Sequence, residues 1–274
     1  MKSALIHAFA RVRKYSMPIF LDSVIEFYIT NQCNLACTNC NRFNDHDFRG
    51  HYSWEDSADA VEAWSQRINA PLLTIIGGEP SLHPGLETWV ANLRGLWPDT
   101  EIMIQSNGTN ARLARELDLW NKYRTGWGIS VHQPQMRPAL EKQWFPVING
   151  FFENTEFTPA AVIPYGDSFA VHHSNPVTAF NACTMRTSHT IFRGQLYKCP
   201  VMAVLPEFRT QQSVIMNERQ EQLLSQYQPL SADCTEQQLT DFVNTRHQPI
   251  AQCEFCPGTF DFQPVVFHAR KKQL

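Results

Sequence analysis

The sequence predicts an α/β protein in which a parallel sheet, closed or partly closed into a barrel, precedes a small cysteine-rich module. Two patterns indicate this. From residue 24 onward, short runs rich in Ile, Val, Phe and Tyr alternate with amphipathic helical segments. Five of the eight cysteines then fall after residue 176. Alternating strands and helices are typical of a parallel sheet with helical crossovers, and 274 residues suffice for one sizeable domain and a smaller one.

The expected strands follow one another at regular intervals. They cover residues 24–30, 72–78, 101–107, 126–132 and 157–163, and each is bounded by Gly, Pro or Asn. The segments between them carry apolar faces at helical spacing, marked by Trp64, Trp89 and Trp120. We therefore expect an N-terminal amphipathic helix within residues 1–23, the barrel over 24–175, the cysteine-rich module over 176–262 and a C-terminal tail over 263–274.

Composition excludes several functional classes. The chain is 43% apolar and 18% charged, with a formal net charge of -3, which is ordinary for a soluble protein and gives no clear nucleic-acid footprint. No secretory signal or membrane segment is apparent. Closely spaced cysteines in such a chain indicate thiolate ligands in a reducing compartment, so we expect a cytoplasmic protein.

Three cysteines directly after the first strand carry most of the functional information. Cys33, Cys37 and Cys40 have the spacing C-x3-C-x2-C, which can fold around three irons of a cubane cluster. The fourth iron then stays open to a small chelating molecule, whereas a four-cysteine site has no free position. A zinc knuckle completed by a distant cysteine, and chance clustering, are the alternatives at this point.

Other unusual residues also sit where predicted strands end. The second strand ends in Gly77-Gly78-Glu79-Pro80, the third in Ser106 and Asn107, and the fourth contains Ser130 and ends at His132. Loops that follow the strands of a barrel gather at one face, and chemistry collects there. Glycines let backbone groups approach a ligand closely, and a carboxylate such as Glu79 can accept hydrogen bonds from an ammonium group.

The cysteine motif and Gly77-Gly78-Glu79-Pro80 together resemble the radical S-adenosylmethionine (SAM) superfamily. The resemblance implies a partial (β/α)6 TIM-like barrel and a [4Fe-4S] cluster on Cys33, Cys37 and Cys40, with SAM bound to the open iron. It further implies SAM contacts from the residues of the glycine motif and from Ser106, Asn107 and Ser130. The family usually has an aromatic residue just before the third cysteine, whereas this chain has Asn39; this departure concerns the expected adenine contact and not the cluster.

A second set of cysteines lies in the C-terminal module. Cys183, Cys199, Cys253 and Cys256 resemble the auxiliary-cluster domain called twitch, which holds a second [4Fe-4S] cluster. Four thiolates could equally hold a structural zinc. Cys234 is left over and is expected to be a spare thiol, a replacement ligand or a residue on the radical pathway.

The layout of one barrel and one four-cysteine module is similar to that of twitch-type 2-deoxy-scyllo-inosamine dehydrogenases. It implies oxidation of a small-molecule substrate, with flavodoxin or ferredoxin as the electron donor. Modification of a ribosomal peptide, and a non-catalytic iron-sulfur or zinc scaffold, remain alternatives. The proton acceptor or substrate clamp is unknown, with His132, Arg186 and His189 as candidates.

Overall fold

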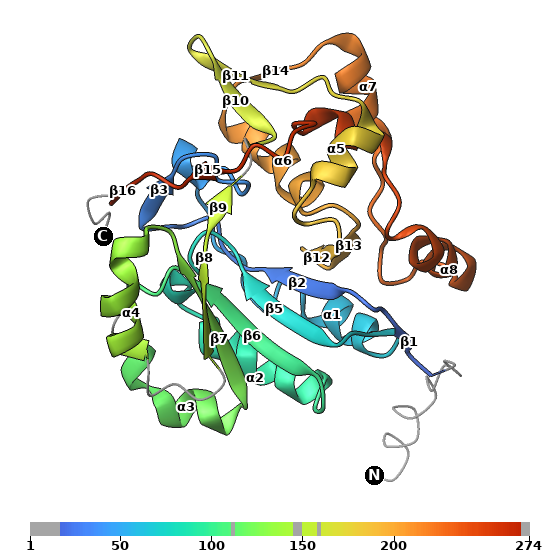
Figure 1. The fold of residues 1–274 in the computed structure, drawn as a ribbon. Coiled ribbons are helices and arrows are strands. Elements are labelled where there is room, and N and C mark those ends of the chain that lie inside the picture. Colours follow the sequence, from blue (N-terminus) through green and yellow to red (C-terminus); the bar gives the residue numbers. More distant parts are fainter. Residues whose placement is uncertain (1–16, 111–112, 145–149, 158–159, 270–274) are drawn as a thin grey trace, which may run out of the picture.

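A strongly twisted sheet with helices on one side forms the centre of the computed structural model, which describes residues 17–110, 113–144, 150–157 and 160–269 (Figure 1). Its largest sheet within these ranges has seven strands. In spatial order they are β13 (Gln195–Tyr197), β12 (Ser188–Phe192), β2 (Val24–Tyr28), β5 (Leu72–Ile76), β6 (Glu101–Ser106), β7 (Thr125–Val131) and β8 (Gly150–Asn154). All neighbouring strands from β12 to β8 pair in parallel. The predicted α/β class with a parallel partial barrel is confirmed.

Four helices connect these strands and cover the sheet. They are α1 (Ala58–Ser65), α2 (Leu86–Leu96), α3 (Leu117–Lys122) and α4 (Arg137–Trp144). Each turns an apolar stripe inward, so that Trp64, Trp89, Trp120 and Trp144 are buried against strand residues such as Trp127. This core fixes the strands, and with them the loops at their carboxyl ends.

The prediction for the fifth strand was wrong. The strand that pairs with β7 is β8, which precedes the predicted range. Residues 157–163 contain the end of β9 (Glu156–Phe157) and the start of β10 (Val162–Tyr165), and both strands belong to other sheets. β8 is the edge strand, and its sequence Gly-Phe-Phe-Glu-Asn is mostly exposed. An exposed edge strand has no continuous apolar run, so the pattern that identified the buried strands missed it.

The sixth parallel strand comes from the C-terminal part of the chain. β12 pairs with the other edge of the barrel, placing Thr190 beside Glu26 and His189 beside Ile25. It continues into β13 through a hairpin, and Gly194 takes a φ of 73° at the turn. The C-terminal part therefore contributes directly to the central sheet.

Helices and short strands make up the rest of the C-terminal part. The helices are α5 (Pro176–Ala182), α6 (Pro200–Gln211), α7 (Glu218–Gln226) and α8 (Glu236–Thr245), and β10 pairs with β11 (Ser168–Val171), which pairs with β14 (Val214–Ile215). Capping boxes begin α7 at Asn217 and α8 at Thr235. A second apolar core joins α6 to the segment that follows Cys40, because Phe208 of α6 packs against Phe43 and Phe48.

Short 3-10 helices and a short pair of strands lie between the longer elements. The 3-10 helices are η1 (Asn44–His46), η2 (Pro80–Leu82), η3 (Leu113–Arg115), η4 (Pro134–Met136) and η5 (Ala251–Phe255). β1 (Ile19–Phe20) pairs with β4 (Ile68–Asn69), while most of the expected N-terminal helix, residues 1–16, lies outside the described residues. None of the helices in the described ranges is long and apolar enough to cross a membrane.

The end of the chain is not simply a tail. β15 (Gln263–Pro264) pairs with β9, and β16 (Phe267–Ala269) pairs antiparallel with β3 (Leu35–Cys37) in the cysteine loop. Figure 1 shows this last segment in dark red, crossing to β3. Such pairing is long-range, and no local pattern in residues 263–269 signals it.

Candidate functional site

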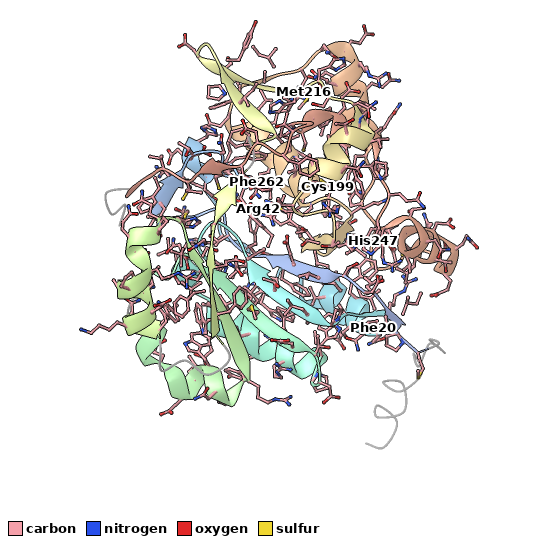
Figure 2. All side chains as sticks on the ribbon, in the orientation of Figure 1. Phe20, Arg42, Cys199, Met216, His247 and Phe262 are labelled. Carbon is pink, nitrogen blue, oxygen red and sulfur yellow. The ribbon has the colours of Figure 1, made fainter. Side chains whose placement is uncertain are left out.

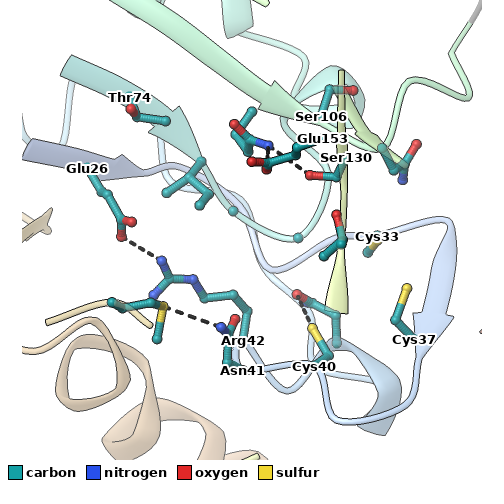
Figure 3. A pocket seen from close by; sticks show the side chains of 18 of the residues that line it. Glu26, Cys33, Cys37, Cys40, Asn41, Arg42, Thr74, Ser106, Ser130 and Glu153 are labelled. Carbon is teal, nitrogen blue, oxygen red and sulfur yellow. Dashed lines mark hydrogen bonds and ion pairs between the residues drawn. The ribbon is translucent and has the colours of Figure 1, made fainter. Parts of the chain in front are cut away.

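A cavity of about 440 Å³ opens where the parallel strands end (Figure 3). Its lining includes Cys33, Cys37 and Cys40 from the loop after β2, together with the backbone of Gly77 and Gly78 after β5. Residues that the sequence placed at separate strand ends therefore share one cavity.

The cysteine loop folds so that its three thiols approach one another. Asn39 takes the left-handed conformation with a φ of 61°, which asparagine tolerates better than most residues. Burial raises the pKa of Cys37, and the neighbouring Cys40 and Cys33 add to the effect. Burial also raises the pKa of Cys40, to about 11. Three crowded thiols would deprotonate readily only beside positive charge, so this donor set fits an iron-sulfur cluster.

The two glycines of the second motif are packed tightly against the start of the cysteine loop. A Cβ on Gly77 would lie 2.4 Å from the carbonyl oxygen of Thr30, and one on Gly78 would lie 2.4 Å from that of Gln32. The Gly78 N–H donates to the Thr30 carbonyl at 2.7 Å, and the Glu79 N–H donates to the Gln32 carbonyl at 2.7 Å. Close approach of these two backbones explains why neither position carries a side chain.

Glu79 is buried, and its carboxylate accepts three hydrogen bonds from neighbouring residues. Its Oε1 accepts from the Ser106 hydroxyl at 2.8 Å and from the Ser81 N–H at 3.0 Å, while its Oε2 accepts from the Asn107 N–H at 2.7 Å. The residue is 1% exposed and lies outside the cavity lining, and burial raises its pKa. Glu79 thus joins the ends of β5 and β6, and Pro80 begins η2 directly after it.

A polar network that the sequence analysis missed fixes the cysteine loop to the end of β6. The Asn107 side-chain amide donates to Asn34 Oδ1 at 2.9 Å, Asn34 donates to Thr109 Oγ1 at 2.7 Å, and Thr109 donates to Asn107 Oδ1 at 2.6 Å. Asn34 lies inside the cysteine motif, so its position was the available signal. The network holds Asn34, the neighbour of Cys33, beside the residues that follow β6.

On one side of the cavity, β6, β7 and β8 each contribute one residue to a polar wall made of Gln105, Ser130 and Glu153. Gln105 Nε2 donates to Ser130 Oγ at 2.7 Å and to Glu153 Oε1 at 2.8 Å. Gly128 makes room for this arrangement, because a Cβ there would lie 2.3 Å from the Gln105 side-chain oxygen. Burial raises the pKa of Glu153. Of these residues, the sequence indicated only Ser130 as a residue of the site.

A buried ion pair lies on the opposite side of the cavity, as Figure 3 shows. Arg42 Nη2 is 2.5 Å from Glu26 Oε2, and the two side chains are 5% and 8% exposed. The Thr190 hydroxyl donates to the same carboxylate oxygen at 3.2 Å. Both charged residues line the cavity, and neither was singled out from the sequence.

Of the three candidate proton acceptors or clamps, only His132 lines the cavity, and burial lowers its pKa to about 4, so its imidazole is neutral at pH 7. Arg186 is exposed and donates to the carbonyls of Asn181 and Cys183. His189 faces α8, with its ring 5.2 Å from that of Phe242. Residues alternate along a strand, so β12 directs Thr190 toward Glu26 and His189 to the opposite side.

The buried His189 predicts a loss of stability in acid. Burial lowers its pKa from 6.5 to about 4, so between these values the unfolded chain binds a proton that the folded chain excludes. The contribution of His189 should fall by about 2 kcal/mol from pH 7 to pH 5. We expect His189→Gln to reduce the pH dependence of the urea unfolding free energy by that amount. An unchanged pH dependence would contradict the buried neutral imidazole.

The second set of cysteines also comes together. Burial raises the pKa of Cys199 to about 12, with further contributions from Cys183 and Cys253. Burial also raises the pKa of Cys256, and the other three thiols of the set add to this effect. Figure 2 places Cys199 in the part that covers one end of the sheet. Cys234 lies elsewhere, with its Sγ 3.3 Å from Arg67 Nη1. The same four thiols could hold an iron-sulfur cluster or a zinc ion.

No group of three or more His, Cys, Asp or Glu side chains in the described ranges is arranged to hold a metal ion as it stands.

Comparison with known proteins gives one family. Residues 27–143 match the sequence model of the radical SAM superfamily. No curated protein matches the chain. Among solved structures, BtrN in complex with AdoMet and 2-DOIA is similar at a TM-score of 0.47 and 14% identity, over 90% of this chain and 94% of that one. Selenomethionine-labelled BtrN in an open conformation gives 0.45 and 12%, over 89% and 94%.

Proposed function

Because this chain carries a radical SAM domain over residues 27–143, we propose that it is a radical SAM enzyme that oxidises a small molecule in the cavity beside Cys33, Cys37 and Cys40. The family implies SAM and a [4Fe-4S] cluster. When bound, they supply a 5′-deoxyadenosyl radical that removes a hydrogen atom from the substrate. The observation that supports the proposal best is the cavity itself, which is lined by all three thiols and by Gly77 and Gly78.

The residues of the chain have separate roles in this proposal. The three thiolates hold the cluster, and the backbone of Gly77 and Gly78, packed against Thr30 and Gln32, forms the part of the cavity wall beside the methionine part of SAM. The wall of Gln105, Ser130 and Glu153 offers donors and acceptors for hydroxyl or amino groups. Glu79 holds the strand ends in place through its three accepted hydrogen bonds.

The four cysteines of the C-terminal part suit a second cluster, which would take up the electron that the substrate radical releases when it loses a proton to a base. Burial raises the pKa of Cys183, and the Met185 N–H and the charges of Arg186 and Arg42 partly offset this effect. The Asn41 side-chain amide also contacts Met185 Sδ at 3.3 Å, and both residues line the cavity. A short path between the two cysteine groups is what an electron acceptor would need.

The small size of the cavity favours a small-molecule substrate over a peptide. A volume of about 440 Å³ is within the range of pockets for small ligands. Flavodoxin or ferredoxin is the proposed electron donor, and the cytoplasm the proposed location.

Anaerobic reconstitution with iron and sulfide tests the proposal. The protein should produce 5′-deoxyadenosine from SAM when dithionite is added, and product formation should increase with the true substrate. Absence of 5′-deoxyadenosine under these conditions would reject radical SAM catalysis. Deuterium transfer from a peptide into 5′-deoxyadenosine, with none from small molecules, would favour peptide modification.

A double variant tests the second cluster separately. Cys253→Ala/Cys256→Ala should lose about four of about eight iron atoms and still bind SAM. It should cleave SAM but fail to complete substrate oxidation. Unchanged iron content, or stoichiometric zinc in the wild-type protein, would reject an auxiliary cluster at this position.

A further inference from the structure

The segment of residues 263–269, here called the C-terminal strap, lies across the outer side of the cysteine loop. At one end β15 pairs with β9, and at the other β16 pairs with β3, with Phe267 opposite Cys37. Each end is therefore fixed to a different part of the molecule. The strap crosses the space between them next to the thiols.

Hydrogen bonds with Thr38 hold the centre of the strap. The Thr38 N–H donates to the Val266 carbonyl at 2.8 Å, and the Thr38 hydroxyl donates to the same oxygen at 3.0 Å. The Val266 N–H lies 3.2 Å from the Thr38 Oγ1 and donates to it. Thr38 follows Cys37 directly, so these contacts connect the strap to the ligand loop itself.

The inner face of the strap is apolar and packs on the cysteines. Val265 is 5% exposed and forms one cluster with Leu35 and Cys37, against which Cys33, Cys40 and Phe267 pack. The next residue, Val266, faces outward and is 52% exposed. The two neighbouring valines therefore have opposite environments.

We propose that the C-terminal strap is the outer wall of the three-thiol site, where it keeps water and dioxygen away from the thiols and from the cluster they hold. The protection of the cluster rests on the proposed function, whereas the shielding of the thiols is independent of it. Val265 closes the wall, and Thr38 is the positioning residue that keeps it shut. Iron-sulfur clusters in contact with solvent and dioxygen are readily lost, so a covering apolar segment has a direct chemical use.

Alkylation of the metal-free protein tests the strap without requiring any cluster. Reduced apoprotein is treated with iodoacetamide under anaerobic conditions, and modification of each cysteine is followed by peptide mass spectrometry. Val265→Ser should increase the alkylation rate of Cys37 about tenfold, because local opening becomes easier. Thr38→Val, which removes the hydroxyl but keeps the shape, should act in the same direction. Val266→Ser is the matched control and should leave the rate unchanged.

Cys234 serves as an internal reference, because it lies beside Arg67 and outside the apolar cluster of the strap. Its alkylation rate should stay constant in all variants. An unchanged Cys37 rate in both Val265→Ser and Thr38→Val would overturn the proposal. A parallel rise at Cys234 in both variants would also overturn it, because the effect would then be global unfolding.

The reconstituted protein provides the second readout. On exposure to air, the iron-sulfur absorption of Val265→Ser should decay several times faster than that of the wild-type protein or Val266→Ser. If no cluster forms in the wild-type protein, the proposed function fails, while the alkylation result still decides whether the strap covers the thiols. Equal decay in all three reconstituted proteins would reject protection of the cluster.

Discussion

Replacing Cys33 with alanine is expected to abolish formation of 5′-deoxyadenosine and to remove about four of about eight iron atoms. Cys33 lines the cavity together with Cys37 and Cys40 and is held there by the contact of its neighbour Asn34 with Asn107. Two thiols cannot retain a cluster that needs three protein ligands, so activity should fall to the background of the assay. Iron analysis and chromatography of the reaction products measure both effects.

Cys234→Ala is the matched control for this experiment. Cys234 is also a partly buried thiol, but it contacts Arg67 and lies outside both cysteine groups. The variant should keep its iron and its 5′-deoxyadenosine formation. Loss of a cluster in Cys234→Ala, or residual SAM cleavage in Cys33→Ala, would contradict the ligand assignment.

The sequence predicted the parts of the site that depend on local spacing. Cysteines three or four residues apart must lie in one loop, and the carboxyl ends of parallel strands must share one edge of the sheet. The sequence could therefore predict that Cys37, Gly77 and Ser130 line one cavity. The second cysteine group was also brought together by the fold. What could be predicted was therefore which residues converge.

The roles of individual side chains were harder to predict. Glu79 was expected to accept a hydrogen bond from the ligand, and the structure shows its buried carboxylate accepting three hydrogen bonds from Ser81, Ser106 and Asn107, which the sequence did not indicate. His189 was a candidate because of its residue type, yet the register of β12 turns it toward α8. Both outcomes depend on pairing partners far away in the sequence.

Some contacts around the cavity come from segments that are distant in the sequence. Thr190 reaches Glu26 only because β12 joins the edge of the barrel, and Val265 reaches Cys37 only because the end of the chain returns to β3. Neither association leaves a periodic or compositional signal. Tertiary pairing decided them, and the sequence of each segment alone gave no indication.

Substitution of Arg42 by methionine is expected to destabilise the folded protein by about 3 to 5 kcal/mol. Glu26 would remain buried without its cationic partner, with the Thr190 hydroxyl as its contact at 3.2 Å. A buried carboxylate that loses its counter-charge keeps the cost of leaving water without the compensating attraction. Urea unfolding of the metal-free protein, followed by circular dichroism, measures the change.

The double variant Glu26→Gln/Arg42→Met separates the cost of an unpaired charge from the cost of lost packing. It should recover most of the stability, because a neutral amide leaves no buried charge uncompensated. Arg137→Met is the surface control, since the ion pair of Arg137 with Glu141 is 34% and 44% exposed and should contribute less than about 1 kcal/mol. If Arg42→Met proved no more destabilising than Arg137→Met, water in the cavity would have to solvate the carboxylate of Glu26, and the buried ion pair would not contribute to the stability of the fold.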